Sequence, residues 1–498
     1  MPNDFDDREI VGDGKIFIAG KDTGQLVPVR VVIPRKLSEL PKATLIPSAE
    51  QFKGLVYVSS GVLSLLLENE DEDRRLDLRI DALWIEQGTQ KRTPSGVDSR
   101  IDATPRGISI VDRYKRTIIQ EPLKPPVLRM WVSQNKNLFP AVLFGTDSQG
   151  ISYVDQVVYE ISAVLPQGSR IVFVGDKLWR VGASSKERNL FASCELDACF
   201  VDLDQAVAAL LSDLNDYLLV VSLATRTRTT AFGWDLVSGG ETRAQYLAGT
   251  SIPTGYSVGN GDDLVDRSDH AEFFQHGFDR MVLSAFRESL QSAVYALTPQ
   301  MASVLEHDFL SLFSAIEEIL LQYRRQAGLE FVLPLAEWSG VKSAIKRSIK
   351  GSVSDKETRR RLYQKLDEIN RISIAEGFSK FASDHDVDLA DTWPLFDTTD
   401  GASLYELRNW LAHGEPIPRE IEGHLWVAQK HLRWTLERIV LKLLDWPLER
   451  SEISPSFLRS HATAMHRLKQ ARSGISKVMK GVPAEKEREK KKVSGTIS

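Results

Sequence analysis

Short apolar runs separated by turn-forming residues fill the first half of the chain. Within 76–87, apolar Leu76, Leu78 and Ile80 alternate with charged residues, which is the period-two pattern of a half-buried strand. One amphipathic helix is predicted at 203–216. The runs predicted as strands are 15–20, 27–34, 76–87, 127–133, 141–145, 170–175 and 217–224. We therefore expect residues 1–260 to form a β-rich domain, either a sandwich or a mixed sheet.

The pattern changes near residue 260. Residues 250–270 are rich in Gly, Ser and Asp, as in a linker or a long loop. From residue 271 onward apolar residues recur every three or four positions, which is typical of amphipathic helices. The predicted helices span 271–297, 300–328, 335–350, 355–375, 402–413, 418–446 and 455–480. The expected fold class is α+β multidomain, with a β-rich first domain, an all-α bundle over 271–450 and a tail over 451–498.

The composition is that of a globular protein without an overall basic charge. A hydrophobic content of 42% allows most of the chain to bury a core, and a net charge of −5 excludes a basic field over the whole chain. Any RNA binding must then come from local patches. The acidic N-terminus lacks the apolar segment of a signal peptide, and no run of about 18 apolar residues predicts a membrane span. We therefore expect a cytoplasmic protein without a membrane partner.

The cysteines and the C-terminal tail offer little chemistry. Cys194 and Cys199 are spaced poorly for zinc and have no second ligand pair, so we expect reduced thiols and no metal. The tail over 451–498 is basic, and its charged run at 485–492 has no apolar face. It is either a solvated, partly disordered segment or a tether for an RNA backbone.

One segment of the helical half combines residue types that suit phosphodiester chemistry. In LYELRNWLAHGEPIP (404–418), Leu404, Leu407 and Leu411 form one buried stripe, and Gly414 and Pro416 end the helix. The polar residues that lie off this stripe are Arg408, Asn409 and His413.

These three side chains are the predicted catalytic residues for RNA cleavage. The imidazole of His413 can move the protons of the attacking 2′-OH and the leaving oxygen. The guanidinium of Arg408 can clamp the phosphate, and the Asn409 amide can orient either partner. Because the substrate supplies its own nucleophile, this reaction needs neither a metal nor a cofactor.

The same residues carry a family resemblance. Arg408, followed by the polar Asn409 and by His413 after four intervening residues, resembles the HEPN ribonuclease motif. The upstream segment 312–323 is similar to the first HEPN helix, especially in the ApeA-like branch of phage-defence proteins. Over about 300–450 the resemblance implies a helical bundle that forms a homodimer and pairs two motif copies across one cleft.

The resemblance also implies an activity and a role. It implies metal-independent RNA cleavage that leaves a cyclic phosphate, with RNA such as tRNA rather than DNA as the partner. It further implies a toxin-like effector of antiviral defence. In such an effector we expect the β-rich half to sense a trigger, to select the substrate or to restrain the nuclease.

Other interpretations stay open at this point. The bundle could be an inactive scaffold for dimerisation or RNA binding, with Arg408 in a surface ion pair to Glu406 or Glu415 and His413 only ending a helix. Glu317 and Glu318 either form a solvated acidic face or reach the motif from the upstream helix.

The remaining candidates favour structural roles. Two acidic groups could hold a metal but resemble ordinary acidic loops, and the EF-hand spacing is absent. These groups are Asp262, Asp263, Asp266, Asp269 and His270, and Asp384, His385, Asp386, Asp388 and Asp391. His424 and His431 are expected to cover a helix face. Trp410, Trp426 and Trp434 are expected in the core or a dimer interface rather than in base stacking.

Overall fold

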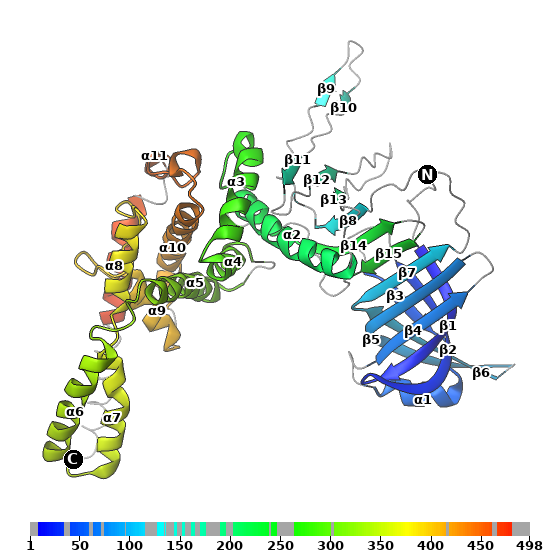
Figure 1. Ribbon diagram of the computed structural model, residues 1–498, viewed down its shortest axis with the longest axis horizontal. Coiled ribbons are helices and arrows are strands. Elements are labelled where there is room, and N and C mark those ends of the chain that lie inside the picture. Colours follow the sequence, from blue (N-terminus) through cyan, green and yellow to red (C-terminus); the bar gives the residue numbers. More distant parts are fainter. Residues whose placement is uncertain are drawn as a thin grey trace. The chain divides into compact units, whose positions relative to one another are not determined.

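The computed structural model divides into two compact units, Met1–Ser257 and Val258–Ser498 (Figure 1). The residues that it describes are 8–33, 40–58, 63–70, 74–94, 96–114, 127–133, 135, 144–146, 152–154, 161–164, 170–175, 190–195, 203–238, 241–246, 263–299, 303–414, 418–460 and 466–480. The expected α+β class, with a β-rich first part and a helical second part, is confirmed.

The first unit is built on one large antiparallel sheet. The strands are β1 (Arg8–Ile18), β2 (Lys21–Ile33), β3 (Lys42–Leu45), β4 (Leu63–Glu70), β5 (Arg74–Thr93), β6 (Gly96–Pro105), β7 (Ile108–Tyr114), β8 (Val127–Val132), β11 (Ile161–Val164), β12 (Arg170–Gly175), β13 (Leu190–Glu195), β14 (Ala231–Ser238) and β15 (Glu241–Tyr246). A separate pair joins β9 (Phe144–Thr146) to β10 (Ser152–Val154). The strand order in the large sheet is β11-β12-β13-β8-β14-β15-β7-β5-β4-β1-β2-β3-β6.

The first six strands close into a ring. The long strand β5 pairs with β4 near its start and with β6 near its end, and β6 also pairs with β3. Alternate side chains of these strands, such as Ile16, Leu65 and Ile80, are fully buried inside. A Cβ at Gly14 would lie 2.7 Å from a Leu65 methyl carbon, so glycine there lets this side chain pack directly on the neighbouring backbone.

A short helix lies against this ring. Helix α1 (Ala49–Val56) starts with a capping box in which Ser48 and Gln51 satisfy each other's backbone N–H groups. Its Phe52 and Val56 pack close to Gly88 of β5, where a Cβ would meet Val56 at 2.8 Å. The apolar residues that alternate along 76–87 therefore belong to the closed core of this ring.

One strand prediction is wrong. Residues 217–224 extend helix α2 (Leu203–Thr225) and form no strand. Because this run is almost continuously apolar, its periodicity does not distinguish a buried strand from a buried helix. The helix predicted at 203–216 simply continues, and every residue from Tyr217 to Thr225 is buried. Of the predicted strand at 141–145, residues 141–143 lie outside the described part of the chain, as does Cys199.

Helix α2 is also long and apolar enough to cross a membrane by length and composition. However, 67% of its apolar segment Val207–Thr225 is buried inside the structure. Burial of this kind is typical of a helix in the core of a folded domain, so length and composition alone do not make α2 a membrane span.

The second unit is helical. Its helices are α3 (His270–Leu283), α4 (Arg287–Leu297), α5 (Leu305–Gln326), α6 (Leu335–Ser352), α7 (Lys356–Ile369), α8 (Ile374–Asp384), α9 (Leu404–Ala412), α10 (Glu422–Leu443), α11 (Pro455–Ser460) and residues 466–480. Helix α10 is the central element, since every residue from Val427 to Leu441 except Lys430 is buried. Helix α5 contacts α4, α8, α9 and α10, so it supports the helix that carries the predicted motif.

Two predicted helices are each divided in the structure. The helix predicted at 271–297 breaks at Ser284, whose backbone is extended and whose hydroxyl accepts the Phe286 N–H at 3.0 Å. The helix predicted at 355–375 breaks at Asn370, whose side chain binds the backbone of Leu333. Short polar side chains that bind backbone groups compete with a continuous helix, which the apolar period does not reveal.

The predicted tail contributes to the helical unit over part of its length. Residues 466–480 are helical, and Ala471 and Ile475 are fully buried. The half-buried Gly474 lies close to His424 of α10, since a Cβ there would meet the imidazole at 2.4 Å. The charged run at 485–492 lies outside the described residues.

A buried histidine at the start of α3 predicts a pH-dependent stability. His270 is 4% exposed, and its Nε2 lies 3.0 Å from the Val265 carbonyl oxygen. Burial lowers the pKa of His270 below its usual value, although Asp263 opposes the shift. As the pH falls, His270 is therefore protonated in the unfolded chain at a higher pH than in the native state. The native state loses stability as the pH falls below about 6.5.

The urea midpoint is expected to fall more for the wild type than for His270→Gln between about pH 7.5 and about pH 5.5. The exposed His307→Gln serves as the control and should fall as the wild type does. An equal fall in the wild type and His270→Gln would show that this imidazole does not contribute.

Candidate active site

Helix α9 carries the predicted motif and begins with a capping box. The Ser403 hydroxyl accepts the Glu406 N–H at 3.1 Å, and the Glu406 carboxylate accepts the Ser403 N–H at 3.2 Å. The predicted stripe of Leu404, Leu407 and Leu411 is buried, which confirms the expected orientation of the helix. The polar residues of α9 therefore lie off this stripe.

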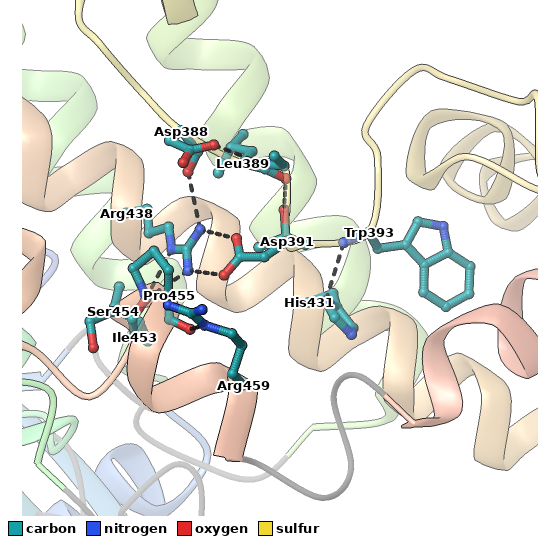
Figure 2. Close-up of polar contacts among 12 residues, drawn as sticks. Asp388, Leu389, Asp391, Trp393, His431, Arg438, Ile453, Ser454, Pro455 and Arg459 are labelled. Atoms are coloured by element: carbon teal, nitrogen blue, oxygen red, sulfur yellow. Dashed lines mark hydrogen bonds and ion pairs between the residues drawn. The ribbon is translucent and has the colours of Figure 1, made fainter.

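The start of α9 is fixed to the loop before it and to α10. The fully buried Trp393 donates its indole N–H to the Ala402 carbonyl at 2.8 Å, and the Leu404 N–H donates to Pro394 at 3.1 Å. Figure 2 shows the Trp393 backbone N–H directed at Nδ1 of His431, 3.2 Å away. These contacts hold α9 at a fixed place on the bundle core.

Arg408 lies between two polar partners. Its Nη2 donates to Glu317 Oε2 of α5 at 3.1 Å, and its Nη1 donates to Asn409 Oδ1 at 3.2 Å. The side chains of Arg408 and Glu317 remain 32% and 26% exposed, so the guanidinium also faces solvent. The carboxylate fixes the orientation of the guanidinium while part of it stays accessible to an anion.

His413 is the residue at which α9 ends. Its backbone has φ −80° and ψ 1°, and its N–H donates to the Asn409 carbonyl at 3.1 Å. Gly414 follows with φ +70°, a left-handed conformation that glycine adopts without strain and that ends the helix as predicted. The His413 side chain is exposed, and within the described part of the chain it has no hydrogen bond or ion pair.

The structure brings two of the three predicted side chains into contact, since Arg408 donates a hydrogen bond to Asn409, and among the described residues neither of them hydrogen-bonds to the His413 side chain. Arg408, Asn409 and His413 lie within six consecutive positions, in the second half of α9 and at its end. At about 100° per residue, Asn409 and His413 lie away from the buried stripe, whereas Arg408 lies at its edge, where it meets Glu317 of α5. Asn409 and His413 are four positions apart, a spacing that places side chains on one helix face. A guanidinium can bind a phosphate, and an imidazole can take a proton from one substrate oxygen and give a proton to another.

The structure distinguishes the roles of the acidic residues near the motif. Glu317 reaches Arg408, whereas Glu318 accepts a hydrogen bond from the Ser292 hydroxyl at 3.2 Å. Glu406 is occupied in the helix cap, so the ion pair considered between Arg408 and Glu406 is not formed. Glu415 lies outside the described residues.

If the motif has the ribonuclease activity that its residues predict, replacing Glu317 by Gln is expected to lower the cleavage rate by about tenfold, because Arg408 loses the charge that orients it. The free energy of unfolding should change by less than about 1 kcal/mol, since a partly exposed ion pair contributes little. The matched control is Glu318→Gln, one position along α5. Equal cleavage rates in the two variants would show that Glu317 has no positioning role.

The acidic residues considered for metal binding bind different partners and do not converge on one point. Asp263 pairs with Arg267, Asp269 with Arg450, and Asp386 with Lys442. The Tyr323 hydroxyl donates a hydrogen bond to Asp384, and burial, together with this bond, raises the pKa of Tyr323 to about 12. In the part of the chain that is described, no three His, Cys, Asp or Glu side chains gather as a metal site would require. Asp262 lies outside that part.

The histidines and tryptophans on α10 have mostly structural surroundings. His431 is fully buried and packs edge-on against Trp434, with 5.0 Å between the ring centroids. Trp434 is 6% exposed and belongs to the core. Trp426 is 37% exposed, with the Lys430 ammonium 5.6 Å from its ring centroid. Trp410 is half-buried on α9.

Comparison of this chain with models of protein families, with curated proteins and with solved structures gives no match. The resemblance to HEPN ribonucleases therefore stays a prediction from the motif and its helical setting.

Proposed function

We propose that this protein is a metal-independent endoribonuclease of the HEPN type. The observation that supports it is the exposed His413 at the end of the same helix whose Arg408 is oriented by Glu317. His413 moves the protons during attack of the ribose 2′-OH, and Arg408 stabilises the charge on the phosphate. Asn409 accepts a hydrogen bond from the guanidinium and helps to set its plane.

The proposal includes a homodimer and a cellular role. Two copies of the bundle pair so that two His413 side chains share one groove, as the resemblance implies. The β-rich unit acts as the sensor or restraint, and the cleaved RNA, with tRNA as one candidate, belongs to a cell under viral attack. The protein is accordingly placed in the cytoplasm.

A second candidate is a catalytically inactive scaffold for dimerisation or RNA binding. One observation favours it, because the Arg408–Glu317 ion pair joins α9 to α5 and would serve a purely structural purpose. The exposed imidazole argues against it, since a scaffold gains nothing from a histidine that bonds to no described residue at that position.

The test is cleavage of RNA by the purified full-length chain with EDTA present. The proposal predicts fragments with 2′,3′-cyclic phosphate ends, unaffected by the chelator. RNA that stays intact at high enzyme concentration, or cleavage only when a divalent metal is restored, would favour the scaffold or a metal-dependent activity elsewhere in the chain.

A further inference from the structure

The helical hairpin of α6 and α7 has a charge opposite to that of the chain. Although the net charge of the protein is −5, the segment 342–365 holds nine basic residues against two acidic ones. The basic residues are Lys342, Lys346, Arg347, Lys350, Lys356, Arg359, Arg360, Arg361 and Lys365. A local concentration of positive charge on an acidic protein is typical of a site for a polyanion.

The hairpin is a thin arm with most of its surface in solvent. Its two helices lie side by side in Figure 1 and pack against each other, with the Tyr363 hydroxyl donating to the Lys346 carbonyl at 3.2 Å. Among the described side chains of α6 and α7, only Trp338 and Leu366 are buried. In the part of the chain that the structure describes, no third layer of structure covers these positive charges.

The base of the hairpin is fixed to the bundle. Asn370 is 2% exposed and accepts the Leu333 N–H at 2.8 Å, while its amide donates to the Leu333 carbonyl at 3.0 Å. Arg324 of α5 donates to the Ile372 carbonyl at 3.1 Å. These bonds join the two ends of the hairpin to each other and to the helix that contacts the candidate active site.

Three of the cations are fully available for a ligand. Arg347, Lys350 and Lys356 are exposed and form no hydrogen bond or ion pair with any described residue. Arg359 has a structural role instead, since its Nη1 donates to the Val353 carbonyl at 3.0 Å and so satisfies the end of α6. Arg360 pairs with Glu357.

We propose that the α6–α7 hairpin is an arm that binds the sugar–phosphate backbone of RNA, and this rests on the proposed ribonuclease function. Its aromatic residues are the buried Trp338 and the half-buried Tyr363, so it offers no platform for stacking bases. Binding is therefore electrostatic and independent of sequence.

A membrane is the less suitable polyanion for this arm. Membrane-binding helices insert Trp, Phe or Leu beside their basic residues. The residues at the end of α6 and just after it are small or polar, with Gly351, Ser352 and Ser354 around the half-buried Val353. The most exposed apolar side chains of the two helices, Leu335 and Ile369, lie at the base of the hairpin.

The test measures RNA binding by full-length His413→Ala protein, which does not cut its ligand, at several salt concentrations. The probe is a fluorescent hairpin RNA. Adding Arg347→Gln, Lys350→Gln and Lys356→Gln should weaken binding at least ~10-fold near 0.1 M salt and reduce the salt slope by about 2 to 3. The matched control removes three exposed cations from the C-terminal helix, Arg467→Gln, Lys469→Gln and Lys477→Gln.

An equal loss in the control, or no change in the hairpin variant, would overturn the proposal. A hairpin variant that loses binding to anionic vesicles but keeps RNA binding would point to a membrane and also overturn it. Failure of the proposed ribonuclease function gives a different result. If wild-type protein binds RNA through the hairpin but does not cut it, the ribonuclease proposal is wrong and the RNA-binding arm still stands.

Discussion

Replacing His413 by Ala is expected to slow RNA cleavage by about 10²- to 10⁴-fold, the usual contribution of a positioned general acid or base. The imidazole is exposed at the end of α9, outside the buried stripe that holds this helix on the bundle. The variant should therefore unfold at the same temperature as the wild type. Single-turnover cleavage in EDTA, with thermal unfolding measured in parallel, separates the two effects.

The control is His307→Ala, which removes another exposed histidine, from α5. It should cleave RNA at the wild-type rate. If His413→Ala and His307→Ala cleave equally fast, His413 has no catalytic role, and the motif is only a structural helix end.

Replacing Asp391 by Ala is expected to lower the free energy of unfolding by about 3–5 kcal/mol, because it leaves a buried guanidinium without its counter-charge. Arg438 of α10 is 0% exposed. Figure 2 shows its guanidinium facing the Asp391 carboxylate, with Nη2 2.8 Å from Oδ2. Its other protons are donated to the carbonyl groups of Asp388 and Ile453.

This network joins the loop after α8, the central helix and the chain before α11, so its loss affects the whole bundle. Urea denaturation measures the effect. The control is Glu357→Ala, which breaks an exposed ion pair with Arg360 and should cost less than about 1 kcal/mol. A change in Asp391→Ala as small as in the control would mean that Arg438 finds water or another partner.

The alternation of apolar and polar residues predicted many of the individual strands and helices. It did not predict which of these elements pair with one another. The pattern at 76–87 predicted β5, but nothing in it indicated that one strand would pair with both β4 and β6 and close a ring. The apolar run at 217–224 was assigned to a strand because a buried helix has the same composition. The Arg438–Asp391 pair joins residues 47 positions apart, which one sequence does not reveal.

The candidate site was easier to predict from the sequence, because its residues share one helix. The stripe of leucines and the glycine after His413 predicted which face of α9 would be polar and where it would end. Glu317 lies 91 positions before Arg408 and was one of two open alternatives. The basic hairpin was missed, although the net charge of 342–365 could have been counted from the sequence.

The most direct test of the central claim compares two substrates that differ by one oxygen atom. An oligoribonucleotide and the same strand with a 2′-deoxy sugar at the mapped cleavage site are incubated with wild-type protein in EDTA. We predict cleavage of the first strand with a 2′,3′-cyclic phosphate end and none of the second at that site. Equal cleavage of both strands would contradict attack by the 2′-OH and, with it, the role assigned to Arg408 and His413.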